Sequence, residues 1–162
     1  MNALARTCEL ELLERLLEEG GPPALLAALD EALAATPDGT RVTLEGGLLV
    51  GREALEAIRA AVELDRAHLE RHPEALFQCL WNRLWWHDAP EAAAFYADPA
   101  RGPWAGQGPK LSALAERWRA AKEAAGAVWL RSRRPPAEPL SAAGAVQVLR
   151  GNDRPVEAMA RW

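Results

Sequence analysis

The segment that decides the fold is Leu76-Phe77-Gln78-Cys79-Leu80-Trp81-Asn82-Arg83-Leu84-Trp85-Trp86-His87-Asp88. Three of the chain's seven tryptophans fall within it. Its apolar residues recur at spacings of three and four, which predicts a helix over about residues 74–87. These residues cover most of the helix circumference and therefore indicate a central, buried helix. We expect its contribution to the core to come from Leu76, Leu80, Trp81, Leu84 and Trp85.

Leucine stripes predict more helices on both sides of this segment. One spans residues 7–19 and ends at Gly20-Gly21, and Pro22-Pro23 begin the next, which ends before the turn signal Thr36-Pro37-Asp38-Gly39. Pro73 ends another helix because it lacks a backbone N–H. We expect these later helices over residues 52–71, 89–96 and 110–124.

Two connections carry specific expectations. Asp88-Ala89-Pro90-Glu91 has the spacing of a capping box, in which Asp88 accepts a hydrogen bond from the backbone N–H of Glu91. In residues 40–51, Val42 and Leu44 alternate as in a strand, but Gly46-Gly47 interrupt them. A lone strand has no partner, so we interpret this stretch as an irregular connection and leave a strand open.

The chain therefore reads as all-α, a compact bundle of five or six helices with a short extended C-terminal tail. The bundle is expected over residues 1–126. A Pro-rich linker packing on the bundle follows over residues 127–143, and residues 144–162 alternate as strands do. With 162 residues, the chain fits one domain of ordinary size.

Composition restricts the partners and the compartment. The net charge of −4 argues against nucleic acid and anionic membrane as main partners, since both need a basic surface. The basic cluster Arg131-Ser132-Arg133-Arg134 is interpreted as a solvated linker. No apolar run reaches membrane-spanning length, and the N-terminus has no signal core. With only Cys8 and Cys79, we expect a cytoplasmic protein and leave its oligomeric state open.

No catalytic or metal-binding pattern emerges. Gly106-Gln107-Gly108-Pro109-Lys110-Leu111-Ser112 fails as a phosphate loop, because Pro109 removes a backbone donor and Leu111 separates Lys110 from Ser112. His68 and His72 have a spacing that can bind zinc, but we interpret them as exposed helix residues. We expect no enzyme activity, no cofactor and no metal. Cys79 reads as an inert buried thiol, and His87 as a cation favoured at a helix end.

The tryptophans outside the core pattern are the candidate contacts. Trp86, Trp104 and Trp129 are candidates for exposed anchors of a protein partner, since aromatic residues dominate interface hot spots. Arg131 and Arg134, which follow Trp129, complete the candidate interaction residues. The alternative function is small-molecule binding in an aromatic pocket between the tryptophan-rich helix and the Trp104 loop.

Several segments resemble a helical region that lies before WD-repeat β-propellers in bacterial signalling proteins, including apoptosome-like STAND NTPases. They are residues 72–82, 85–93, 108–112, and 128–132 with 134–136. The tail from Val148 to Trp162 is similar to the opening of a WD repeat, with Gly151-Asn152 in place of the usual Gly-His pair. The resemblance implies a non-enzymatic adaptor that links a switch or effector module to a propeller. The propeller or the effector domain would then be its protein partner.

Overall fold

The computed structural model describes residues 3–140. It is mainly helical, as predicted, but it also holds a small sheet. The strand-like tail expected over residues 144–162 lies outside the described residues. In chain order the elements are α1 Ala3–Thr7, α2 Leu10–Ala34, β1 Arg41–Thr43, β2 Leu49–Gly51, α3 Arg52–Leu64, α4 Arg66–Leu69, the 3-10 helix η1 Pro73–Ala75, α5 Leu76–Asp88, the 3-10 helices η2 Pro90–Phe95 and η3 Pro103–Ala105, and α6 Leu111–Ala124.

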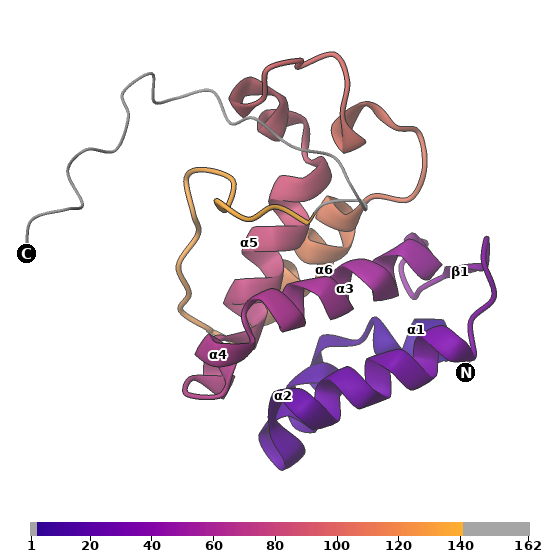
Figure 1. Cartoon of the computed structure of the whole chain (residues 1–162), viewed down its shortest axis with the longest axis vertical. Helices are drawn as coiled ribbons and strands as arrows, with labels where there is room; N and C mark the ends of the chain where they lie inside the picture. The colour runs from indigo at the N-terminus through magenta and orange to yellow at the C-terminus, as the bar shows by residue number, and fades with distance from the viewer. Residues whose placement is uncertain (1–2, 141–162) are drawn as a thin grey trace, which may run out of the picture.

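Helix α5, the tryptophan-rich segment, is the central element of the bundle. It packs against both α3 and α6, and α3 packs in turn against α2 (Figure 1). The predicted core residues of α5 are buried: Leu76, Leu80, Trp81 and Leu84 have no exposed surface, and Trp85 is 6% exposed. Burial of large apolar side chains on several flanks of one helix holds the neighbouring helices together.

The break predicted at Gly20-Gly21 is present as a kink inside α2. Gly21 has φ 67°, a backbone angle that residues other than glycine rarely adopt, and Pro22 and Pro23 restart the helix directly after it. The buried leucines of both halves belong to the core, among them Leu13, Leu17, Leu25 and Leu29. The two predicted leucine stripes therefore lie on the two arms of one kinked helix.

The interpretation of residues 40–51 as an irregular connection is wrong. Strands β1 and β2 form an antiparallel hairpin in which Arg41 lies opposite Gly51, Val42 opposite Val50 and Thr43 opposite Leu49. Gly46 and Gly47 have φ of 85° and 83°, the left-handed conformation that tight hairpin turns require. Gly46 and Gly47, which interrupt the strand pattern in the sequence, thus form the turn that pairs β1 with β2.

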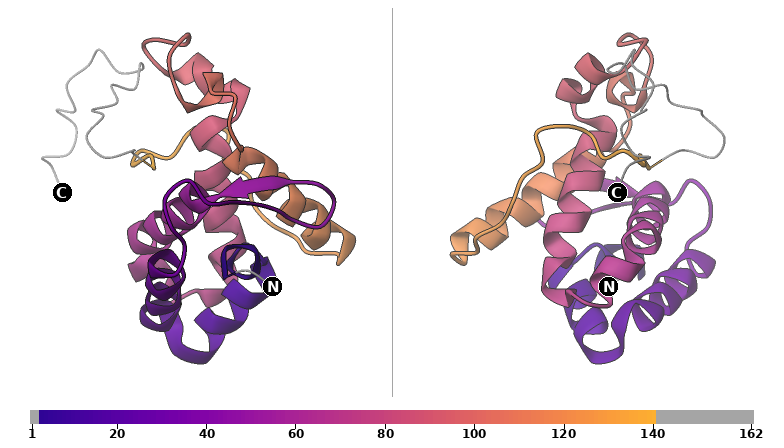
Figure 2. Two further views of the ribbon diagram at one scale, coloured as in Figure 1. Left: turned by 90° about the vertical axis from the view of Figure 1, so that its right-hand side faces the viewer. Right: turned by 60° about the vertical axis from the view of Figure 1, so that its left-hand side comes forward.

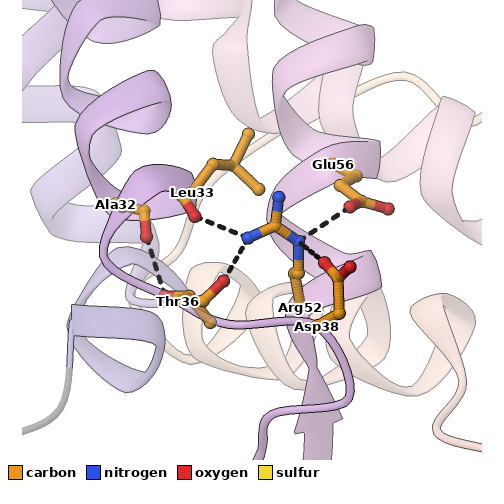
Figure 3. A network of polar contacts seen from close by, with 6 residues as sticks. All are labelled: Ala32, Leu33, Thr36, Asp38, Arg52 and Glu56. Carbon is orange, nitrogen blue, oxygen red and sulfur yellow. Dashed lines mark hydrogen bonds and ion pairs between the residues drawn. The ribbon is translucent and has the colours of Figure 1, made fainter.

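Arg52 joins the end of α2 to the start of α3, as Figure 3 shows. Its guanidinium donates to the carbonyl oxygens of Leu33, at 2.5 Å, and Thr36. It also forms ion pairs with Asp38 at 3.1 Å and Glu56 at 3.0 Å. The last carbonyls of a helix lack partners within the helix, and the guanidinium of the partly buried Arg52 supplies donors at this helix end.

The helix expected over residues 52–71 is interrupted, because α3 ends at Leu64 and the short α4 begins at Arg66. Asp65 lies at this break. Its two carboxylate oxygens accept hydrogen bonds from Arg83 of α5 at 2.6 and 2.7 Å, a bidentate pair with both side chains largely buried. The break in α3 thus places a carboxylate against the central helix.

The capping box predicted for Asp88 and Glu91 is also wrong. The buried Asp88 carboxylate accepts hydrogen bonds from the backbone N–H groups of Leu111, at 2.6 Å, and Ser112, at 2.8 Å. Asp88 therefore caps the first turn of α6, whose positive end attracts a negative charge. Glu91 is exposed at its side chain. One carboxylate at the end of α5 fixes the start of the helix packed beside it.

This assignment predicts that Asp88→Ala lowers the free energy of unfolding by about 2 kcal/mol, because one buried and one partly buried N–H group lose their acceptor. Asp88→Asn should lose less, since its amide oxygen still accepts one bond. Urea denaturation measures both. The matched control is Glu91→Ala: a capping box requires a loss from this change, whereas the structure predicts almost none.

Candidate functional site

The aromatic residues of α5 belong to a continuous row of contacting rings that extends beyond the helix. Trp81 stacks on Trp85 with ring centroids 5.1 Å apart, and Trp85 meets Trp86 edge-on at 4.8 Å. We call this set the aromatic ladder. Its members, in contact order, are Phe77, Trp129, Trp81, Trp85, Trp86 and Phe95.

The segment after α6 lies along this ladder. We call residues 127–140 the strap; it leaves the end of α6 and runs beside α5, as the right-hand view of Figure 2 shows. Gly126, with φ 78°, ends α6 and turns the chain toward α5. Residues far apart in the sequence are therefore side by side, with the strap covering a flank of α5 that neither α3 nor α6 covers.

The strap is held by its backbone. Gln78 accepts from the N–H of Leu130 at 2.9 Å, and Asn82 donates to the Leu130 carbonyl at 3.1 Å. Asn82 also accepts from the N–H of Ser132 at 2.8 Å, and the Trp86 indole donates to the Ser132 carbonyl at 3.4 Å. These three α5 residues are spaced four apart and so lie on one helix face. They bind an extended chain much as a neighbouring strand would.

The intervening strap residues insert their side chains against the ladder. Trp129 lies 4.7 Å from the Trp81 ring and 5.2 Å from the Phe77 ring, centroid to centroid. The Arg131 guanidinium lies over Trp85 at 4.4 Å and over Trp81 at 5.0 Å, a double cation–π contact. Side chains of an extended segment alternate, which explains why Trp129 and Arg131 point to α5 while Leu130 is exposed.

The structure corrects one candidate contact and separates another. Trp86, a candidate for an exposed anchor, is only 5% exposed, because Trp85, Phe95 and the strap surround it. Trp104 lies apart from the ladder. Its ring packs on Tyr96 at 4.6 Å and its indole donates to the Pro99 carbonyl at 2.8 Å. Trp86 and Trp104 therefore serve different parts of the fold.

Two pockets lie near these residues. A pocket of about 330 Å³ beside the strap is lined by Trp85, Trp86, Glu91, Arg131, Ser132 and Arg133. A larger pocket of about 500 Å³ lies between α3 and the end of α5, where its walls include Glu56, His87 and Lys110. Trp104 lines neither pocket, so neither of them is the aromatic pocket expected between Trp86 and Trp104.

His87 at the larger pocket is not the cation expected at a helix end. Burial lowers its pKa below the ordinary value of 6.5, and Lys110 lowers it further. Asp88 and a hydrogen bond to the backbone of Leu140 oppose this shift without reversing it. Desolvation thus outweighs the Asp88 charge and the Leu140 hydrogen bond, and the neutral imidazole is favoured near neutral pH.

The remaining reactive candidates are inert or incomplete. Burial raises the pKa of Cys8 to about 12 and that of Cys79 to about 11, so both are thiols at neutral pH. The exposed rings of His68 and His72 lie 4.9 Å apart, and His72 contacts Glu74. Within residues 3–140, no three His, Cys, Asp or Glu side chains form a group suited to a metal ion.

Sequence reasoning missed the polar residues that hold the strap. Gln78 and Asn82 are spaced four apart on the tryptophan-rich helix, a signal that was available, but their partners are backbone atoms about fifty residues away. Arg83 was missed as well; besides Asp65 it binds the carbonyl of Glu138 at 2.6 Å. Arg134 is exposed, and no ion pair of this residue occurs in the part of the chain that the structure describes.

Comparison with known proteins gives no relative. The chain matches no known family model, no curated protein and no solved structure. Of the helices described between residues 3 and 140, none combines the length and apolar character needed to cross a bilayer.

Removing one side-chain contact to the strap is predicted to speed hydrogen exchange at the one backbone amide that this contact protects. Gln78→Ala should speed hydrogen exchange at the Leu130 amide, and Asn82→Ala at the Ser132 amide, since each removes the acceptor of that N–H. Residue-resolved hydrogen exchange by NMR measures both. Gln107→Ala, on the exposed loop before α6, is the matched control. Equal protection in all four proteins would contradict the side-chain attachment of the strap.

The lowered pKa of His87 predicts a pH dependence of stability. In the unfolded state His87 has its ordinary pKa of 6.5, whereas in the folded state its pKa is lower. The unfolded state therefore binds more protons as the pH drops from 7.5 toward 5, and the free energy of unfolding falls over this range. His87→Gln should reduce this fall, and His68→Gln, an exposed control, should not. Denaturation curves across this pH range decide; an unchanged slope in His87→Gln would contradict the burial of a neutral imidazole.

Proposed function

We propose that this chain is a non-enzymatic interaction module, an adaptor in which the bundle fixes the path of the segment that leaves it. The observation that carries the proposal is the attachment of the strap. Four backbone hydrogen bonds at Leu130 and Ser132 and the stacking of Arg131 hold an extended segment against α5. A tether that must only connect two modules needs no such attachment.

The resemblance to helical regions before WD-repeat propellers supports the same role. The segments that carry it include the tryptophan-rich helix and residues 128–132, and in the structure these two segments contact each other. On this proposal the bundle links a switch or effector module to a propeller in a bacterial signalling protein of the cytoplasm. A strap held at fixed residues would set the orientation of whatever follows it.

The site chemistry agrees with a non-catalytic role. The cysteines are protonated thiols, and the carboxylates Asp65 and Asp88 are already bound to Arg83 and to the first turn of α6. In this proposal the two carboxylates have a structural role, because both hold helices together.

The adaptor proposal predicts a fixed strap. Spin labels at Glu63→Cys on α3 and Glu138→Cys on the strap, in a Cys8→Ala/Cys79→Ser background, should give a narrow distance distribution by pulsed electron resonance. Asn82→Ala should broaden it, since two of the four backbone bonds are lost. The control is the same spin-labelled protein with Gln107→Ala in place of Asn82→Ala, and its distance distribution should stay narrow. A broad distribution before any strap mutation would contradict the proposal.

A second measurement tests the non-enzymatic assignment. Calorimetric titration with magnesium ATP should show no binding to the protein. A dissociation constant in the micromolar range, about −8 kcal/mol of binding free energy, would overturn the assignment.

A further inference from the structure

We propose that the outer edge of the strap, residues 128–133, is a docking edge for an extended acidic peptide. This inference rests on the proposed function, because it names the chemistry of a partner for the same surface. The geometry, the apolar contacts and the charges of the strap each contribute a separate part of the argument.

The strap has one edge in use and one edge free. Leu130 and Ser132 direct both N–H and carbonyl groups at Gln78, Asn82 and Trp86. In an extended chain the groups of the intervening residue point the opposite way, so those of Arg131 face away from α5. Within residues 3–140 they meet no hydrogen-bond partner. Such an edge accepts another extended segment by main-chain pairing.

Two large apolar side chains lie on this free part of the strap. Val128 is 99% exposed and Leu130 is 73% exposed, whereas Trp129 between them is half-buried against the ladder. Their spacing of two places them on the same face of the extended segment. Exposed apolar residues beside an unpaired edge favour a partner with apolar residues at alternate positions.

The charges of the strap select an acidic partner. Arg131, Arg133 and Arg134 are exposed and form no ion pair with any described residue, although many other arginines of the chain do. Stacking on Trp81 and Trp85 fixes the plane of the Arg131 guanidinium and leaves its N–H groups free for a carboxylate. The same charges disfavour a second copy of the strap, because like charges facing one another across paired strands repel.

The pocket beside the strap gives an acidic side chain a place to bind. Its volume is about 330 Å³, with Trp85 and Trp86 as aromatic walls and Arg131 and Arg133 as donors. Ser132, which also lines it, has a buried hydroxyl with no hydrogen-bond partner in the described part of the chain. Glu91 is the one carboxylate among the lining residues, and its exposed side chain is free to turn toward solvent.

The test uses fluorescein-labelled hexapeptides of alternating glutamate and valine, with glutamine–valine and lysine–valine versions as controls. Fluorescence anisotropy of the full chain should give at least about tenfold tighter binding of the glutamate peptide than of either control, equivalent to about 1.4 kcal/mol. Two further glutamate peptides carry N-methyl groups at the odd-numbered or at the even-numbered amides. One of the two should bind at least about tenfold more weakly, because main-chain pairing uses alternate amides.

Substitutions on the protein locate the edge. The double substitution Arg133→Gln/Arg134→Gln should weaken binding of the glutamate peptide at least about tenfold, since it removes two of the three strap arginines that form no ion pair. Arg71→Gln/Arg101→Gln, which removes two exposed arginines elsewhere, should leave the affinity unchanged. Leu130→Gln should weaken binding while leaving the far-UV circular dichroism unchanged, because its side chain points to solvent.

Three results would overturn the inference: no binding of any peptide up to about 1 mM, equal affinity for the glutamate and glutamine peptides, or no effect of N-methylation in either register. Equal binding of a thymidine hexanucleotide would also overturn it, since a generic polyanion needs no strand edge. If the peptides fail while the spin-label distances stay narrow, only this inference is lost. Broad distances in the unmutated protein would contradict the proposed function itself.

Discussion

The constraint on which the structure depends is that α5 is apolar around most of its circumference and so must be covered on nearly every side. Helices α3 and α6 cover two flanks, and the strap, with Trp129 and Arg131 against the aromatic ladder, covers another. A fully buried tryptophan removes a large apolar area from water, worth several kcal/mol. Trp81 is fully buried although its indole N–H has no partner within residues 3–140, and its ring stacks on that of Trp85.

The polar residues of the same helix determine which neighbour covers which flank. Arg83 binds Asp65 at the break after α3, Asp88 holds the first turn of α6, and Asn82 holds the strap. Apolar burial alone is non-directional and would tolerate several arrangements of the neighbours. Each of these polar contacts is lost if the neighbour shifts, and at Asp88 the shift would leave a buried carboxylate unpaired, so together they select one arrangement.

The sequence predicted the parts of the fold that depend on local pattern. The buried residues of α5, the kink at Gly21 and the start of α6 follow from periodicity and from glycine and proline placement. The sequence pattern does not reveal the hairpin, because Gly46-Gly47 interrupt the alternation and β2 is only three residues long. Asp88, Asn82 and Arg83 were missed for a different reason: their partners lie 18 to 55 residues away, where spacing carries no signal. The burial of Trp86 followed from the strap, whose path no local pattern specified.

The strap connects this architecture to the proposed function, because the element that completes the cover of α5 is also the segment that leaves the bundle. The most direct measurement is the proton NMR spectrum of the Arg131 side chain. Stacking over Trp85 and Trp81 predicts upfield ring-current shifts of its resonances, which disappear in Asn82→Ala. Random-coil shifts of Arg131 in the native protein would contradict the account, because the strap would then not lie on the aromatic ladder.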